Sequence, residues 1–299
     1  MIDIVISTNN RFAQHSGVML TSLFENNKNE SFSIHVLFFY LSVINKKDLE
    51  LIVNHYGHKL FFYKIQSDYW ENLQQDRIVT SEAYNRLLIP ELLPYSVMKA
   101  LYLDSDIIVN GEISELWNID IEKYSAAVVV EKIPEEKNIF KRIGCEGNEY
   151  FNSGVLLLNL AFFRMNNLSY EVRRMITNYG DKLSYYDQDI LNVVFNKTKR
   201  IIPEKWNYVH GKNGIDKKNN EIAVLIHYIG PIKPWHWGCK HISSKLYTKY
   251  LSLTPWKDFK PTFWKSIKDL KWGYYVAYLM NMESVYFHIG QIVKSCIKK

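Results

Sequence analysis

The chain is expected to fold as an α/β protein around a mostly parallel sheet. Two observations predict this class. Apolar runs alternate with helical patterns through the first hundred residues, an order typical of βαβ units. The apolar runs are also continuous, as expected for parallel strands that are buried on both faces.

The predicted elements follow one another in a regular order. The expected strands are residues 3–7, 32–40, 59–65 and 100–103, and the expected helices between them are residues 14–25, 46–55 and 81–93. Short strands at residues 126–130, 155–158 and 224–227 come next, together with a helix that Asp187 opens. The chain shows no internal repeat and no low-complexity segment.

Composition limits the class of protein further. Hydrophobic residues make up 47% of the 299 residues and charged ones 23%, as in ordinary soluble globular proteins. The three cysteines are scattered, which favours a reducing compartment over a disulfide framework. No apolar run approaches the roughly 18 residues of a membrane span. No basic segment precedes the first strand, so no secretory signal is expected.

The positive charge is concentrated at the end of the chain. Eight lysines and three acidic residues lie in residues 255–299, a net charge of +5 out of +6 for the whole sequence. Tryptophans and tyrosines accompany them, a combination typical of helices at anionic membrane surfaces. We expect a catalytic domain, residues 1–254, and a basic, aromatic C-terminal helical tail, residues 255–299. A packed helix with solvated lysines is the alternative for the tail, and nucleic acid is not an expected partner.

The most informative motif is an acidic pair behind a buried strand. Asp104 and Asp106 follow residues 100–103, and alternate residues of an extended segment point the same way. Two carboxylates at the carboxyl end of a strand suit a divalent cation. An equally simple interpretation is that they end the strand and cap a turn.

Four further motifs carry polar side chains at the ends of predicted elements. They are the loop with Ser7, Thr8, Asn9 and Arg11; Arg86 on a helix; Asn152-Ser153-Gly154 before a strand; and Asp187-Gln188-Asp189 at a helix start. The loop lacks Gly-x-Gly-x-x-Gly, so a nicotinamide or flavin enzyme is not expected. Each motif also has a structural interpretation: a polar loop, a solvated arginine, a close backbone approach or an N-cap.

The last motif surrounds a histidine. His227 ends a predicted strand, and Gly230 and Lys233 follow it. A neutral imidazole would complete the coordination of a cation held by Asp104 and Asp106, and such mixed ligands favour Mn²⁺ over Mg²⁺. Lys233 would then lie near a diphosphate. A structural histidine is the simpler alternative.

Taken in order, these motifs resemble glycosyltransferase family eight. The resemblance consists of Asp-x-Asp after Leu-Tyr-Leu, Phe-Asn-Ser-Gly, Asp-Gln-Asp and His-Tyr-x-Gly-x-x-Lys-Pro-Trp, between about Met1 and Trp237. The chain is especially similar to the bacterial lipopolysaccharide galactosyl- and glucosyltransferases. The resemblance implies the GT-A fold, a Rossmann-like nucleotide-diphospho-sugar transferase architecture. It also implies Mn²⁺, with Mg²⁺ as the alternative, a UDP-hexose donor, a saccharide acceptor such as the lipopolysaccharide core, and retention of configuration.

The resemblance also implies roles for individual residues. Asp104, Asp106 and His227 would bind the metal, and Gly230 and Lys233 the diphosphate. The uridine would contact Ser7, Thr8, Asn9 and Arg11, and the sugar would contact Arg86, Asn152, Asp187 and Gln188. Ser105, Ser153 and Glu131 complete the expected donor site. This chain has Asn9 where aspartate is common and Arg11 where asparagine is, which bears on recognition of the base, although an asparagine amide can still pair with uracil. It has Glu131 where a shorter aspartate is frequent, which bears on the choice of hexose.

The resemblance places Gln188 opposite the leaving group, and an amide is a poor nucleophile. We therefore expect attack on the same face as the departing phosphate, with Asp189 as the alternative nucleophile. The expected location is cytoplasmic, on the inner face of the membrane. A metal-dependent nucleotidyltransferase and a non-catalytic, membrane-associated UDP-sugar-binding protein are the competing functions.

Overall fold

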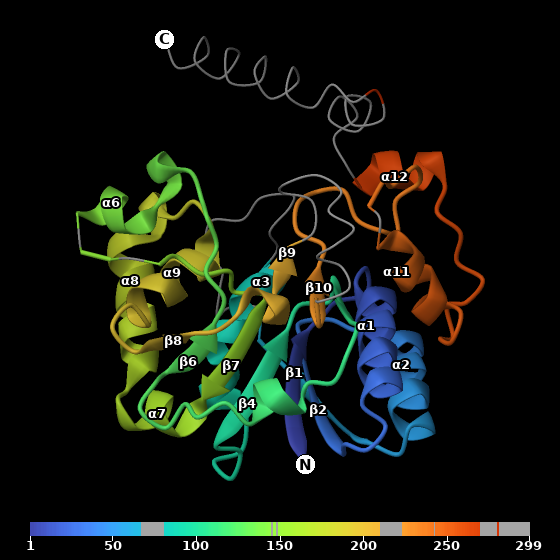
Figure 1. Ribbon diagram of the computed structural model, residues 1–299, viewed down its shortest axis with the longest axis horizontal. Helices are drawn as coiled ribbons and strands as arrows, with labels where there is room; N and C mark the ends of the chain where they lie inside the picture. The colour runs from blue at the N-terminus through green and yellow to red at the C-terminus, as the bar shows by residue number, and fades with distance from the viewer. Residues whose placement is uncertain are drawn as a thin grey trace.

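The computed structural model describes residues 1–66, 81–144, 146–147, 149–209, 223–241, 243–269 and 280. A seven-stranded sheet in the order β3-β2-β1-β4-β7-β6-β8 forms its centre (Figure 1). The strands are β1 (Ile2–Ser7), β2 (Phe32–Phe38), β3 (Lys59–Lys64), β4 (Lys99–Leu103), β6 (Ala126–Val128), β7 (Val155–Asn159) and β8 (Lys199–Ile201). All except β7 run in the same direction, which confirms the expected mostly parallel α/β sheet.

Helices cover both faces of this sheet (Figure 1). Ile4 and Ile6 of β1 pack with α1 (Ala13–Asn26) and α2 (Val43–His55) in one hydrophobic cluster. Val5 points to the opposite face, because side chains alternate along a strand, and packs in a second cluster. That cluster contains α7 (Leu160–Met165), α8 (Leu168–Tyr179) and α9 (Tyr186–Val194). Smaller helical segments are α5 (Ser114–Trp117), η3 (Glu135–Lys137), α6 (Ile139–Ile143), η4 (Gly180–Lys182) and η5 (Glu204–Trp206).

The reversed strand β7 matters for the site. It pairs antiparallel with β4, so its first residue Val155 lies opposite Leu103, the last residue of β4. The amide of Asp104 donates to the carbonyl of Gly154 at 2.9 Å. The segment before β7 therefore meets the acidic segment after β4 at one edge of the sheet.

A second sheet of three strands adjoins this edge. β10 (Leu225–His227) lies between β5 (Ile107–Val109) and β9 (Tyr208–Val209). The strand expected at residues 224–227 thus exists, but it belongs to this small sheet and not to the large one. The antiparallel register of β5 and β10 sets His227 opposite Ile107, one residue after Asp106.

The helix expected over residues 81–93 is divided. It consists of α3 (Ser81–Tyr84), a 3₁₀ turn η2 (Asn85–Leu88) and α4 (Ile89–Leu92). Pro90 has no N–H for the carbonyl of Arg86 four residues earlier, and Ile89 donates to that carbonyl instead. The single-helix prediction was therefore wrong at this position, and all four residues of the tight turn are buried.

Residues just beyond the expected boundary at 254 pack on the same body. A Cβ on Gly17 of α1 would lie 2.4 Å from the Trp256 ring, so glycine makes room for the indole. Phe259 packs against the cluster that includes α11 (Ser244–Leu251), and α12 (Phe263–Asp269) follows. We infer that the catalytic domain extends at least to Phe259. The expected tail helix beyond α12 lies outside the described residues.

Candidate active site

One pocket of about 800 Å³ opens where the carboxyl ends of β1 and β4 meet the starts of β7 and α9. Its walls contain most of the residues that the sequence motifs indicated. They are Ser7, Thr8, Asn9, Arg11, Arg86, Asp104, Ser105, Asp106, Asn152, Ser153, Asp187, Gln188, His227, Gly230 and Lys233. Glu131 and Asp189 do not line it. Segments that are far apart in the chain therefore form one site, as expected at the carboxyl edge of an α/β sheet.

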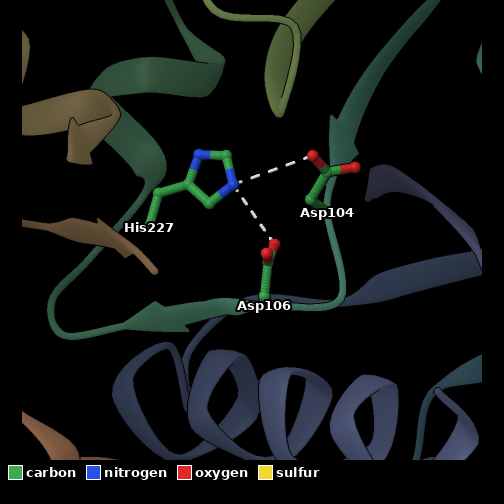
Figure 2. A group of neighbouring side chains, drawn as sticks. All are labelled: Asp104, Asp106 and His227. Carbon is green, nitrogen blue, oxygen red and sulfur yellow. Dashed lines mark ion pairs between the residues drawn. The ribbon is translucent and has the colours of Figure 1, made fainter. Parts of the chain in front are cut away.

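Asp104, Asp106 and His227 converge in this pocket (Figure 2). The Nε2 atom of His227 lies 3.2 Å from an oxygen of Asp106 and 3.7 Å from an oxygen of Asp104. One ligand atom from each residue falls within 4.8 Å of the others. Two carboxylates and an imidazole at this spacing fit a single divalent cation.

The backbone explains how the three side chains come together. Ser105 points away from the pair, and its hydroxyl contacts Ser16 at 2.8 Å and the carbonyl of Ser7 at 3.2 Å. Ser105 and Asp106 form a turn between β4 and β5, so the extended segment expected here is not present, although both carboxylates reach the pocket. His227 is brought in by the pairing of β5 with β10, and the amide of Tyr228 donates to the carbonyl of Asp106 at 3.0 Å.

Lys233 closes one side of the cluster. Its ammonium group lies 2.5 Å from a carboxylate oxygen of Asp106 and donates to the carbonyl of Tyr228 at 2.5 Å. Burial alone would raise the pKa of Asp106, but the positive charges of Lys233 and His227 outweigh it and hold that pKa well below its ordinary range. Asp106 therefore stays ionised and available to a cation.

Arg86 is a buried link between two carboxylates. Its guanidinium lies 2.9 Å from Asp104 and 3.1 Å from Asp187, and it donates to the carbonyl of Ser153 at 2.6 Å. The interpretation of Arg86 as a solvated surface residue is excluded. Burial raises the pKa of Asp187 to about 6 in spite of the adjacent guanidinium. Tyr185 holds the N-cap position of α9, so Asp187 is not the helix cap, and its carboxylate contacts Arg86 and lines the pocket.

Amide side chains form the next part of the wall. The carbonyl oxygen of Gln188 accepts from the amide of Ser153 at 3.0 Å, and its NH₂ group donates to Glu131 at 3.2 Å. Asn152 donates to the same oxygen of Glu131 at 2.9 Å. Glu131 thus lies behind the wall and orients the two amides.

Gly154 shows how tightly these parts are packed. A Cβ at this position would lie 2.2 Å from Cε1 of His227 and 2.7 Å from an oxygen of Asp104. The sequence motif suggested that a ligand approaches the backbone here. The structure shows that two metal-site side chains occupy that space.

Asp189 is separated from the pocket. The residue is fully buried, and its carboxylate accepts hydrogen bonds from Tyr150 at 2.7 Å, Arg142 at 2.8 Å and the amides of Ser184 and Tyr185 at 2.7 and 2.9 Å. These bonds fix the loop that enters α9. Tyr186, the first residue of α9, has φ of +50°, a conformation that costs a non-glycine residue roughly 1–2 kcal/mol.

The loop after β1 is organised by its own side chains. The carbonyl oxygen of Asn9 accepts from the amides of Arg11 and Phe12 at 2.9 and 3.0 Å and so begins α1. The hydroxyls of Ser7 and Thr8 are bonded to Glu82 and Ser16. Asn9 therefore has only its NH₂ group to offer a ligand.

Several pocket residues carry no motif and were missed. His15 stacks on Trp235 with ring centroids 3.5 Å apart, and Trp256, Phe259 and Lys265 line the pocket from the C-terminal segment. Asn207 lies behind His227, with its carbonyl oxygen 2.9 Å from Nδ1 of the ring. Of these positions, Trp235 alone belonged to a sequence motif, as the tryptophan that follows Lys-Pro in the family resemblance.

A sheet of this topology with an Asp–Asp–His cluster at its edge defines a glycosyltransferase of the GT-A fold. The model of glycosyl transferase family 8 matches residues 3–239, and the chain belongs to this family.

Relatives and solved structures agree. The chain is 29% identical to a lipopolysaccharide 1,2-glucosyltransferase of Escherichia coli over 81% of its own length and 76% of that protein. It is 27% identical to a lipopolysaccharide 1,3-galactosyltransferase of Salmonella typhimurium over 80% and 74%. The galactosyltransferase LgtC, solved with donor and acceptor sugar analogs, shares the fold with a TM-score of 0.76 at 23% identity, covering 90% of this chain and 100% of LgtC.

Within the part of the chain that the structure describes, none of the helices has the length and apolarity required to cross a bilayer.

Proposed function

We propose that this chain transfers a hexose, galactose or glucose, from a UDP-sugar to a saccharide acceptor with retention of configuration, and that it requires Mn²⁺. The observation that carries the proposal is the convergence of Asp104, Asp106 and His227 in the large pocket. The names of the glucosyl- and galactosyltransferase relatives support a hexose as the transferred group.

The three side chains are suited to the cation. Carboxylate oxygens and one imidazole nitrogen form a mixed set of ligands that favours Mn²⁺, with Mg²⁺ as the alternative. When bound, the cation supplies positive charge to the departing diphosphate. Asp104, Asp106 and His227 would hold it.

The two ends of the donor have separate contacts. The uridine would lie on the loop of Ser7, Thr8, Asn9 and Arg11, where the NH₂ group of Asn9 donates to a carbonyl of the uracil ring. The diphosphate would lie against Gly230, whose φ of +83° suits a tight turn. Lys233 would leave Asp106 and pair with a phosphate, because both are anions within reach of the same ammonium group.

The sugar would occupy the wall formed by Arg86, Asn152, Asp187 and Gln188. Glu131 contacts both amides and lies outside the pocket lining, so it would act on the sugar through Asn152 and Gln188. Ser153 and Ser105 hold this wall and the nucleotide loop through their own hydrogen bonds.

The chemistry follows from the residue opposite the leaving group. The bond between the anomeric carbon and the phosphate oxygen breaks, and the acceptor oxygen attacks from the same face. The acceptor proton passes to the departing phosphate oxygen. Gln188 would stabilise the positive charge that develops on the sugar through its carbonyl oxygen. Asp189 is saturated by four donors and faces away from the pocket, so we assign it a positioning role and not that of a nucleophile.

The acceptor and the cellular location are proposed together. The lipopolysaccharide names of the relatives support a lipopolysaccharide core or another surface glycan as acceptor. A cytoplasmic enzyme on the inner face of the membrane would meet such an acceptor, and the basic residues 255–299 would attach it to anionic lipid. Sedimentation with anionic vesicles should therefore decrease for a chain that ends at Asp269. Unchanged sedimentation of that shorter chain would contradict membrane attachment through the tail.

UDP release tests the proposed reaction. UDP-galactose and UDP-glucose are incubated with the protein, with and without Mn²⁺, because slow donor hydrolysis needs no knowledge of the acceptor. One of the two donors should give UDP in the presence of the metal only. Donor binding without any release would support a non-catalytic binding protein, and pyrophosphate release from a nucleoside triphosphate would support a nucleotidyltransferase.

A further inference from the structure

His227 is held from behind by a buried asparagine. Nδ1 of the imidazole lies 2.9 Å from Oδ1 of Asn207, while Nε2 faces the two carboxylates (Figure 2). Asn207 is 1% exposed and His227 is 3% exposed. Whether Nδ1 can carry a proton therefore depends on the group that Asn207 presents to it.

The hydrogen bonds on the far side of Asn207 determine whether its oxygen or its NH₂ group faces His227. The NH₂ of Asn207 donates to Oδ1 of Asn152 at 2.9 Å, and Oδ1 of Asn152 also accepts from the backbone amide of Gly154 at 2.9 Å. The NH₂ of Asn152 donates to Glu131, an acceptor, at 2.9 Å. A backbone N–H can only donate and a carboxylate can only accept, so the orientation of Asn152 is fixed at both ends.

The orientation of Asn152 determines the orientation of the Asn207 amide next to it. Because Asn152 presents an oxygen to Asn207, Asn207 must donate a hydrogen bond from its NH₂ group. Its own oxygen then faces His227, and Nδ1 must carry a proton in order to donate to it. Nε2 is thereby the nitrogen that faces Asp104 and Asp106, and a cation bound between them would replace its proton while Nδ1 keeps its own.

The backbone holds Asn207 rigidly enough for this task. It follows the 3₁₀ turn η5, and its amide donates to the carbonyl of Glu204 at 3.0 Å. The next two residues pair with β10 in parallel, with Val209 opposite His227. Asn207 therefore lies directly before β9, the strand that pairs with the strand of His227.

We infer that Asn207 is a positioning residue that fixes His227 in the tautomer able to bind a metal ion. This inference rests on the proposed function. The row Glu131–Asn152–Asn207–His227 also connects the sugar side of the pocket to the metal side through continuous hydrogen bonds. Partners of this kind behind a metal-binding histidine typically contribute 10–100-fold to metal affinity.

Direct Mn²⁺ binding to Asn207→Leu tests the inference. Leucine has nearly the same shape but no polar atom, and free Mn²⁺ is counted by its paramagnetic resonance signal without any substrate. We expect the dissociation constant to rise by about 10–100-fold. The matched control is Asn27→Leu, which removes an equally buried asparagine with hydrogen bonds to Leu23, Gly111 and Ile113, all away from the pocket. It should lose stability and keep the Mn²⁺ affinity of the unmodified chain.

A second measurement does not depend on how the variant folds. Long-range ¹H–¹⁵N spectra of the unmodified protein saturated with Mg²⁺, which is diamagnetic, report which ring nitrogen of a histidine carries a proton. For His227 we expect a protonated Nδ1 and no proton on Nε2. The opposite tautomer would overturn the inference, as would equal Mn²⁺ affinity of Asn207→Leu and the unmodified chain. If the unmodified chain itself failed to bind Mn²⁺, the proposed function would be the part in error.

Discussion

The substitution Gly154→Ala tests the packing of the metal site most sharply. The new methyl carbon would lie 2.2 Å from Cε1 of His227, whereas carbon atoms are comfortable at about 3.5–4.0 Å. The ring would have to retreat by more than about 1 Å, and Asn207 and the β5–β10 pairing oppose this movement. Overpacking of this kind costs about 1–3 kcal/mol of folding free energy.

The same displacement should affect metal binding. Metal sites tolerate deviations of about 0.2 Å in ligand distance, so Gly154→Ala should weaken Mn²⁺ binding by at least about tenfold. Mn²⁺ titration and urea unfolding measure the two effects on one sample. Gly180→Ala is the matched control, because Gly180 has φ of −54° and nothing within 4 Å of its added Cβ. It should be neutral or stabilising by about 0.4–1 kcal/mol. If Gly154→Ala bound Mn²⁺ as tightly as the Gly180 variant, the geometry derived for the site would be refuted.

Three further predictions concern the reacting groups. Gln188→Ala should slow transfer without abolishing it, because the departing phosphate oxygen, and not this side chain, takes the acceptor proton. Initial rates of transfer measure this effect. Complete loss of activity together with a sugar adduct on Asp189 would contradict the prediction. Lys233→Ala should lower kcat by about 10²–10³-fold, because it removes the positive charge that would stabilise the leaving diphosphate. Steady-state rates at saturating donor measure kcat, and an unchanged value would contradict this prediction. Burial raises the pKa of Asp187 from its ordinary 3.8 to about 6, so the folded chain keeps a proton that the unfolded chain has lost. The contribution of Asp187 to stability should therefore fall by about 3 kcal/mol as the pH rises from about 4 to 6, and urea unfolding of Asp187→Asn across this range should lack that fall.

Much of the site was predictable from where polar residues follow apolar runs. The acidic pair comes directly after a buried strand, so its position at the sheet edge follows from the strand pattern, whereas the turn at Ser105 and Asp106 does not. His227 was a candidate ligand from its place at a strand end, with a structural histidine as the alternative, and the sequence did not decide between them. The pairing of β5 with β10 joins segments more than a hundred residues apart, and no local pattern specifies that pairing.

The roles within Asp187-Gln188-Asp189 could not be assigned from the sequence. Two residues apart on an α-helix, side chains point about 200° apart, so one carboxylate faces the pocket while the other enters the core. Sequence alone does not say which. In the structure, Asp187 lines the pocket and Asp189 is buried in the core. Asn207 was invisible for a related reason, because an isolated asparagine acquires its meaning only from the row of amides that the fold builds around it.

The division of the helix over residues 81–93 has a clearer sequence origin. Pro90 removes the amide that would have bonded to the carbonyl of Arg86, and the chain tightens into a 3₁₀ turn. The turn buries Arg86, which then links Asp104 to Asp187. A proline inside a helical pattern was therefore a signal for the site as well as for the fold.

The central claim is that Asp104, Asp106 and His227 hold one divalent cation against the diphosphate of the donor. Anomalous diffraction from crystals soaked with Mn²⁺ and UDP measures this directly. We expect a single strong peak between the two carboxylates and Nε2 of His227, in contact with the diphosphate. A UDP molecule bound in the pocket with no peak there, or with the metal on other residues, would contradict it.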